Sequence, residues 1–139
     1  PAELMKRLGM VHSIMVTSPS DPAMAAAVPI FDSGAGHQAT LDMKAAYEKR
    51  RDFLVAALQD LGFGVATPNG AFYVFAKLPA KYGTDDEAFA TKLAQEGKVA
   101  VFSGSYSGEG GEGYLRMSYA TSMDNLKLAV DRIKTMLNK

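Results

Sequence analysis

Apolar residues near the start of the chain recur at two different spacings. Leu4, Met5 and Leu8 form a short stripe at helical spacing, which predicts a helix over residues 2–9. The apolar and β-branched residues between positions 10 and 16 favour an extended segment directly after it. A helix followed by an extended segment is therefore expected here.

Turn residues between positions 18 and 22 introduce the next element. Asp21 is an N-cap candidate, and Pro22 suits the first position of a helix through the alanine-rich residues 23–28. Pro29 lacks a backbone N–H and is expected to end or kink this helix. Residues 34–36, glycine-alanine-glycine, mark the internal boundary we expect, because two nearby glycines let the chain change direction easily.

The longest amphipathic pattern lies between residues 39 and 61. Its apolar side chains fall on one helical face, while the charged side chains lie mostly elsewhere on the surface. The apolar face consists of Met43, Tyr47, Leu54, Leu58 and Leu61. This pattern predicts one long helix, which Gly62 stops.

Three short strands are expected further along the chain. Residues 71–76 are almost all apolar, which predicts a central strand with both faces covered. Residues 99–102 are a second candidate strand. In residues 114–119 the side chains alternate, and every second one from Leu115 to Tyr119 belongs to the apolar face. The third strand is therefore expected to have two different faces.

Two further helices accompany these strands. Thr84 and Glu87 can form a capping box, in which each side chain satisfies a free amide of the other residue. Gly97 closes the helix that they start. After the third strand, apolar residues at helical spacing predict a final helix, with Thr121 or Ser122 as its N-cap.

These elements define an α+β fold. We expect a two-layer domain in which helices cover a small antiparallel or mixed sheet of about three strands. The long amphipathic helix leads into this domain. The last two strands could form a loose antiparallel hairpin or be separated in the sheet, and the sequence leaves both arrangements open.

The composition excludes several classes of function. With 139 residues, 47% of them hydrophobic, the chain can build one ordinary core. Fifteen basic residues balance fifteen acidic ones, so we expect no binding to nucleic acid or to an anionic membrane. No apolar stretch is long enough for a membrane span, and the absence of cysteine fits a reducing cytoplasm.

Two patterns that suggest ligand sites have simpler interpretations. Residues 108–113 read G-x-G-x-x-G, but a dinucleotide site needs this turn to precede a helix, and here it precedes a strand. Glu109 and Glu112 would also repel a phosphate, so a mobile glycine loop is the better interpretation. His12 and His37 lie far apart, with no cysteine beside them, and no metal site is expected.

Arg116 is the best candidate for a binding residue. A guanidinium held on a rigid strand can grip a carboxylate through two parallel hydrogen bonds. The simpler alternative is an ordinary arginine on the solvent face of an edge strand, and spacing alone favours that alternative.

Several short motifs follow one another in a fixed order from the long helix onward. The first three are Tyr47-x-x-Arg50-Arg51-Asp52, Leu58-x-x-Leu61-Gly62-Phe63 and Pro68-x-Gly70-Ala71-Phe72-Tyr73-x-Phe75. The last is Val99-Ala100-Val101-x-x-Gly104-Ser105-x-x-Gly108, followed by residues 111–120. In this order and spacing the motifs resemble the class I and II aminotransferases of fold type I. Residues 10–30 resemble the family segment just after the cofactor-binding lysine.

The resemblance implies a division of the chain. Residues 1–33 would be the terminal segment of a large domain that binds pyridoxal phosphate (PLP), and residues 34–139 the aminotransferase small domain. The chain begins at Pro1 rather than Met, which we interpret as a sign of a longer gene product. The full-length enzyme would use PLP to move an amino group between an amino acid and a 2-oxo acid.

The resemblance also assigns roles to residues. Arg116 would bind the substrate's α-carboxylate, and Gly70, Ala71 and Phe72 would line the substrate pocket nearby. Ser103 and Ser107 depart from the family pattern, which usually has a proline and an aromatic residue there, so the shape of the loop and the choice of substrate stay open.

No catalytic, cofactor-binding or metal-binding residue is expected in this chain. PLP chemistry needs a lysine, a carboxylate for the pyridinium nitrogen and a phosphate cradle, and the sequence identifies none of them. We therefore expect an inactive chain without bound PLP. A homodimer is expected, because the apolar residues between positions 11 and 30 would pack against a second copy or swap between copies.

Two other classes of function remain open. The chain could be a stand-alone α+β module that binds amino acids or regulates another protein, since small domains of this class often bind ligands without chemistry. It could also be a structural oligomerisation domain. The length of the open reading frame upstream of Pro1 distinguishes these alternatives from the enzyme.

Overall fold

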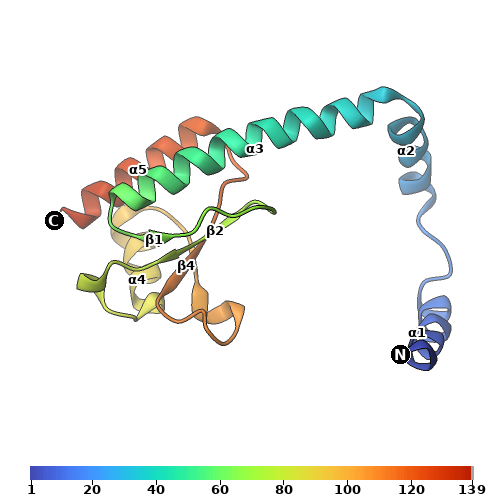
Figure 1. Cartoon of the computed structure of the whole chain (residues 1–139), viewed down its shortest axis with the longest axis horizontal. Helices are drawn as coiled ribbons and strands as arrows, with labels where there is room; N and C mark the ends of the chain where they lie inside the picture. The colour runs from blue at the N-terminus through green and yellow to red at the C-terminus, as the bar shows by residue number, and fades with distance from the viewer. Residues whose placement is uncertain (139) are drawn as a thin grey trace. The chain divides into compact units, whose positions relative to one another are not determined.

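The computed structural model describes residues 1–138, which fall into two compact units, Pro1–Met43 and the described residues from Lys44 onward (Figure 1). The first unit holds helices α1 (Ala2–Met15) and α2 (Asp21–Asp32) and the start of α3 (Gly34–Asp60). The second unit holds the rest of α3 and all the strands. No helix in the described part of the chain is both long and apolar enough to cross a membrane.

Helix α1 is longer than the sequence pattern predicted. The extended segment expected for residues 10–16 is wrong, because α1 continues to Met15. Val11 and Met15 extend the stripe that Leu4 and Leu8 begin, at spacings of three and four residues, so the same helical face simply continues.

Helix α2 begins and ends differently from the prediction. Its N-cap is Ser20 rather than Asp21, and the Ser20 hydroxyl accepts a hydrogen bond from the Ala23 N–H at 3.4 Å. Pro29 does not end the helix but lies inside it. The helix continues because later N–H groups still find acceptors, and the Ser33 N–H donates to the Pro29 carbonyl at 3.2 Å.

The long helix α3 begins at Gly34, five residues before the predicted start. In the second unit it buries Leu54, Val55 and Leu58. Its end confirms the role of Gly62, which has a φ of +88° that suits glycine. The Phe63 N–H then donates to the Leu58 carbonyl at 3.0 Å and satisfies one of the last carbonyls of the helix.

The sheet has four antiparallel strands in the order β1-β2-β4-β3. The strands are β1 (Gly64–Val65), β2 (Tyr73–Lys77), β3 (Phe102–Ser103) and β4 (Tyr114–Ser118). The sequence did not predict β1, which is only two residues long, and placed the start of β3 three residues too early. Of the two arrangements left open for the last strands, the structure has the antiparallel neighbours.

Strand β2 is central, as predicted, but only one of its faces is covered. Val74 and Ala76 are buried, whereas Tyr73 and Phe75 are 36% and 40% exposed. The prediction of two covered faces is therefore wrong, because the helices pack on one face of the sheet and leave the aromatic face of β2 open. Strand β4 has the predicted alternation, with Leu115 and its inward neighbours buried.

Two helical segments complete the second unit. Helix α4 (Asp86–Lys92) continues as a π-helical turn, η2 (Leu93–Gly97), and α5 (Met123–Leu137) ends the described fold. The predicted capping box is wrong: the N-cap is Asp85, whose Oδ1 accepts from the Ala88 N–H at 2.9 Å. For α5 the prediction is confirmed, since the Ser122 hydroxyl accepts from the Asn125 N–H at 3.2 Å.

One core joins the helices to the inner face of the sheet. It contains Leu58 from α3, Leu93 from η2, Leu115 from β4 and Ile133 from α5, all essentially without solvent contact. Figure 1 shows the second half of α3 and α5 running over the sheet. The predicted two-layer α+β fold is confirmed, and its outer sheet face is the one that carries Arg116.

Candidate functional site

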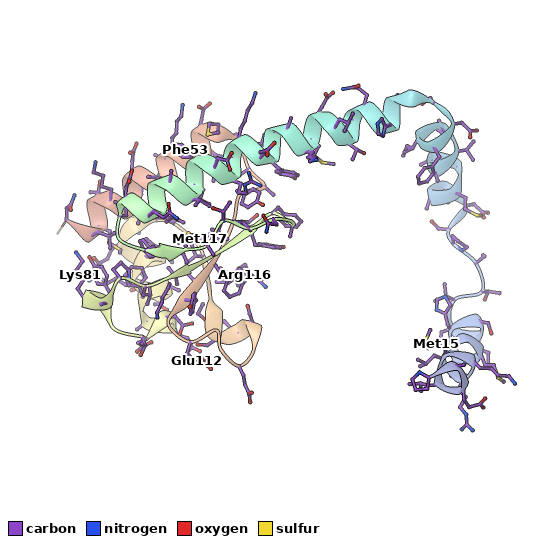
Figure 2. The ribbon with its side chains drawn as sticks, in the orientation of Figure 1. Met15, Phe53, Lys81, Glu112, Arg116 and Met117 are labelled. Atoms are coloured by element: carbon purple, nitrogen blue, oxygen red, sulfur yellow. The ribbon has the colours of Figure 1, made fainter. Side chains whose placement is uncertain are left out.

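Arg116 lies in the middle of the sheet. Strand β4 has β2 on one side and β3 on the other, and Arg116 is directly opposite Phe75 in β2 and Phe102 in β3. The alternative of an arginine on an edge strand is therefore wrong. Its neighbour Met117 points into the core and is buried, while Arg116 belongs to the outer face (Figure 2).

Two aromatic rings flank the guanidinium. The Arg116 Cζ lies 5.1 Å from the ring centroid of Tyr73 and 5.0 Å from that of Phe102. Both distances are within the range of cation–π attraction. Since Tyr73 comes from β2 and Phe102 from β3, the rings hold the cation from the two neighbouring strands.

The hydrogen-bonding capacity of Arg116 is incompletely used within the described residues. Its Nε is buried and has no hydrogen-bond partner there. The ion pairs in this part of the chain involve Arg7 and Arg51 instead. Because Nε is sealed while the side chain as a whole is only half-buried, Nη1 and Nη2 are the atoms left to meet a ligand. Hydrogen bonds from a guanidinium to a carboxylate are charge-assisted and strong, so a carboxylate at Nη1 and Nη2 would be favourable.

The three predicted pocket residues lie just before β2, in the turn that leads to Tyr73. Ala71 has a φ of +58°, which is unusual for a residue with a side chain. Tyr119 holds this turn, because its hydroxyl donates to the Ala71 carbonyl and its N–H to the Phe72 carbonyl, both at 2.9 Å. Strand β2 therefore begins at Tyr73, two residues after the predicted start at Ala71. Tyr119 holds the backbone of the turn that precedes this strand.

Phe72 and Arg116 belong to one aromatic surface. The ring of Phe72 lies 4.3 Å from the ring of Tyr73, centroid to centroid, and Tyr73 flanks the guanidinium. Gly70 is different, since a Cβ added there would meet no atom within 4 Å. Of the three predicted pocket residues, Phe72 is thus connected to Arg116 through Tyr73, whereas packing within the chain gives no reason for a glycine at position 70.

Asp86 anchors the loop between β3 and β4. This carboxylate is 3% exposed and accepts hydrogen bonds from the Ser105 N–H at 2.9 Å, the Ser105 hydroxyl at 2.7 Å and the Gly113 N–H at 3.2 Å. Burial by itself would raise the pKa of Asp86, but the hydrogen bonds from Ser105 and Gly113 outweigh it and lower the pKa. Asp86 therefore fastens both ends of the loop that joins β3 to β4.

The same loop contains the glycine motif. It begins with the 3₁₀ turn η3 (Gly104–Ser107), and a Cβ on Gly104 would clash with the Gly111 carbonyl oxygen. Only glycine permits this close approach of two backbone segments. Residues 108–113 lead directly into β4 rather than into a helix, so the sequence-based argument against a dinucleotide site agrees with the local structure.

The sequence predicts Arg116 as a binding residue, and this stays a prediction, but it does not predict the residues that surround Arg116 or anchor the nearby loop. For Tyr119 the sequence offers one indication of a hydrogen-bonding role: its side chain carries a hydroxyl, whereas the other side chains on that face of the predicted strand are apolar. Asp86 lies between Thr84 and Glu87 of the predicted capping box, and no local pattern connects it with Ser105, 19 residues further along the chain. Within residues 1–138, no group of three or more potential metal-ligating side chains comes together.

Comparison with known proteins identifies the family. The family described as "Aminotransferase class I and II" matches residues 1–133. The chain is 37% identical over 102 residues to aromatic-amino-acid aminotransferase 2 of Thermococcus litoralis, which covers 73% of this chain and 26% of that protein. It is 33% identical over 138 residues to an aspartate aminotransferase of Pyrococcus horikoshii, and this matched region covers 99% of this chain and 35% of that protein. The chain belongs to the class I and II aminotransferases.

A solved structure agrees with this assignment. The crystal structure of an aromatic aminotransferase from Pyrococcus horikoshii superposes with a TM-score of 0.89 at 30% sequence identity, over 99% of this chain and 37% of that one. The chain thus spans about a third or less of the length of the relatives it matches.

Proposed function

We propose that Arg116 binds the α-carboxylate of an amino acid or 2-oxo acid in a PLP-dependent aminotransferase of which this chain is the C-terminal part. In this proposal residues 1–33 end the large PLP-binding domain and residues 34–139 form the small domain. The observation that carries the proposal is the state of the guanidinium: flanked by two rings, with Nε sealed and no acidic partner among the described residues.

The role of the clamp is to orient the substrate. Two parallel hydrogen bonds from a fixed guanidinium to a carboxylate define the direction of the Cα–carboxylate bond, which a single point charge would not do. The β-sheet holds the Arg116 backbone in place, and contact with the rings of Tyr73 and Phe102 limits the movement of the Arg116 side chain. Binding in one orientation lowers the entropic cost of bringing the reacting atoms together.

PLP provides the electron sink for transamination when it is bound, and the proposal places its site outside the described residues. A lysine that reacts with a carbonyl needs a desolvated or cationic environment that lowers its pKa. All nine described lysines are exposed: Lys6, Lys44, Lys49, Lys77, Lys81, Lys92, Lys98, Lys127 and Lys134. We therefore propose that the chain by itself is inactive and that the cofactor is held by other polypeptide of the full-length enzyme.

The substrate is proposed only as a chemical class. The names of the relatives include an aromatic-amino-acid aminotransferase and an aspartate aminotransferase, which act on amino acids with very different side chains. The α-carboxylate is common to these substrates. A cytoplasmic location, expected from the absence of cysteine, stays a prediction.

A homodimer is also part of the proposal. Neither α1 nor α2 buries a residue, and large apolar side chains such as Ile14 (81% exposed) and Phe31 (85% exposed) meet solvent. Apolar surface of this kind favours association, and we propose a second copy as the partner. Sedimentation equilibrium at rising concentration tests this: Phe31→Glu should weaken a self-association seen in the unmodified chain, whereas a strict monomer would contradict it.

The clamp can be tested on the chain itself. A charge-assisted interaction of about 1.5–3 kcal/mol corresponds to a dissociation constant on the order of 10 mM. Pyruvate is therefore titrated to ~200 mM at constant ionic strength while the amide and arginine resonances are followed by NMR. We expect saturable shifts centred on Arg116.

Matched variants show whether the response is specific. Arg116→Gln should abolish the saturable shifts. Arg50→Gln should leave them unchanged, although Arg50 also lies over an aromatic ring, with its Cζ 5.6 Å from the Tyr47 centroid. Equal binding of pyruvate by the chain and by Arg116→Gln would refute the clamp.

The enzyme proposal has its own test. Genomic sequence upstream of the Pro1 codon should continue the open reading frame for some hundreds of residues and include a lysine motif shortly before Pro1. A start codon at or next to Pro1 would support the stand-alone module instead.

A further inference from the structure

Two aromatic rings lie beside Arg116, one from each neighbouring strand. Phe102 in β3 lies directly opposite Arg116. On the other side, Phe75 in β2 lies opposite Arg116, and Tyr73 is two positions before Phe75 in the same strand. The ring centroids of Phe102 and Tyr73 lie 5.0 Å and 5.1 Å from the Arg116 Cζ. The cation thus contacts side chains of two different strands on the outer face of the sheet.

The sealed Nε adds a second restriction. Carboxylates can bind a guanidinium side-on, through Nε and one Nη, or end-on, through both Nη atoms. Nε is buried in this chain, so the side-on approach is closed. An anion can therefore reach only the Nη end of the guanidinium, and the Cζ that joins the two Nη atoms lies within about 5 Å of the ring centroids of Tyr73 and Phe102.

The shape of the anion then matters. A carboxylate is flat, and its two oxygens can lie in the plane of the guanidinium. A sulfonate or phosphate is tetrahedral, and its third oxygen must project out of that plane, toward one of the rings. An oxygen bearing negative charge is repelled by the negative face of an aromatic ring.

We propose that Tyr73 and Phe102 are positioning residues that form a slot selective for planar carboxylates over tetrahedral anions at Arg116. This proposal rests on the carboxylate clamp proposed above and extends it, because it assigns the selectivity to two side chains that do not themselves bind the anion. Removing one ring should lower the preference for a carboxylate over a tetrahedral anion, because the negative face of that ring no longer repels the out-of-plane oxygen.

The test compares acetate with methanesulfonate, two monovalent anions that share a methyl group and differ in the shape of the charged group. Dissociation constants are measured from the Arg116 resonances in the unmodified chain, in Phe102→Leu and in Phe102→Tyr. Acetate is the stronger base, so the informative quantity is the change in the ratio of the two constants between variants. Tyr106→Leu is the control, since Tyr106 is an aromatic residue of the same loop region and is 76% exposed.

The expected result has three parts. Phe102→Leu should lower the preference for acetate over methanesulfonate, because the ring face that repels the third sulfonate oxygen is gone, and its Arg116 Nε–H should exchange faster with water. Phe102→Tyr, which keeps the ring, should restore both properties, and Tyr106→Leu should change neither. Unchanged circular dichroism would show that the fold is intact, and Tyr73→Leu serves as a second variant if Phe102→Leu fails to fold.

Two results would overturn the proposal, and they differ in what else they overturn. If both anions bind at Arg116 and Phe102→Leu leaves their ratio unchanged, the slot is refuted while the clamp stands. If neither anion shifts the Arg116 resonances of the unmodified chain, the clamp and the slot are both refuted.

Discussion

Asp86→Asn tests whether a single buried carboxylate holds the loop between β3 and β4. The two Asp86 oxygens serve different backbone donors: Oδ2 accepts from the Ser105 N–H and Oδ1 from the Gly113 N–H. Asparagine has only one oxygen, so either orientation of its amide places an NH₂ group against one of these N–H groups. One buried donor therefore loses its acceptor whichever way the side chain turns.

The expected cost follows from these bonds. A hydrogen bond to a charged group contributes about 1.5–3 kcal/mol, and an unsatisfied buried donor costs about 1–3 kcal/mol. These terms overlap, so we expect the free energy of unfolding to fall by about 2–4 kcal/mol. That is a large part of the total of about 5–15 kcal/mol typical of a domain.

Urea unfolding followed by circular dichroism at 222 nm measures this loss. With a slope of about 1–3 kcal/mol per molar urea, the midpoint should fall by about 1–2 M. Asp131→Asn, at an exposed position in α5, is the control and should change stability by less than ~0.5 kcal/mol. If Asp86→Asn lowers the free energy of unfolding no more than this control does, the Asp86 carboxylate does not hold the loop between β3 and β4.

Other perturbations test the pH dependence, the core and the turn before β2. The lowered pKa of Asp86 means that its stabilising contribution is present above the ordinary carboxyl value of 3.8 and is lost as pH falls below it. Urea midpoints measured down the acid range should therefore drop more steeply for the unmodified chain than for Asp86→Asn, and parallel curves would contradict this. Leu58→Ala removes a fully buried side chain and should cost about 2–5 kcal/mol in the same assay, against a small effect for Leu128→Ala, which is 48% exposed. Tyr119→Phe removes the hydrogen bond to the Ala71 carbonyl and should cost about 0.5–1.5 kcal/mol, with faster amide exchange in the turn before β2; unchanged exchange would show that the hydroxyl does not hold that turn.

Much of the fold could be predicted because the decisive signals are local. The apolar face of α3, the alternation in β4 and the cap at Ser122 each depend on neighbouring residues, and each is present in the structure. Errors arose where two local signals compete. β-branched residues after position 10 suggested an extended segment, yet the helical spacing that begins at Leu4 continues through them.

The errors at β2 have a different origin. Its nearly continuous apolar pattern is typical of a strand covered on both faces, and the residues themselves cannot show whether the covering layer is in the same polypeptide. In the described residues the layer exists on one face only, so Tyr73 and Phe75 are partly exposed. These side chains are the surroundings of Arg116, which explains why a sequence pattern typical of a core also marks the candidate site.

The candidate site could be predicted only in part. The prediction for Arg116 depends on its place in a family motif, since spacing alone favours an ordinary surface arginine. Phe102 and Asp86 act across the sheet and the loop, at separations that no local pattern reveals. Their roles require the register of β3 against β4 and the path of the intervening loop.

The most direct test of the central claim is a crystal structure of the chain with pyruvate. We predict the carboxylate at the end of the Arg116 guanidinium, with its two oxygens within hydrogen-bonding distance of Nη1 and Nη2 and Nε left without a ligand. Pyruvate bound elsewhere at saturating concentration, with nothing at Arg116, would contradict the account.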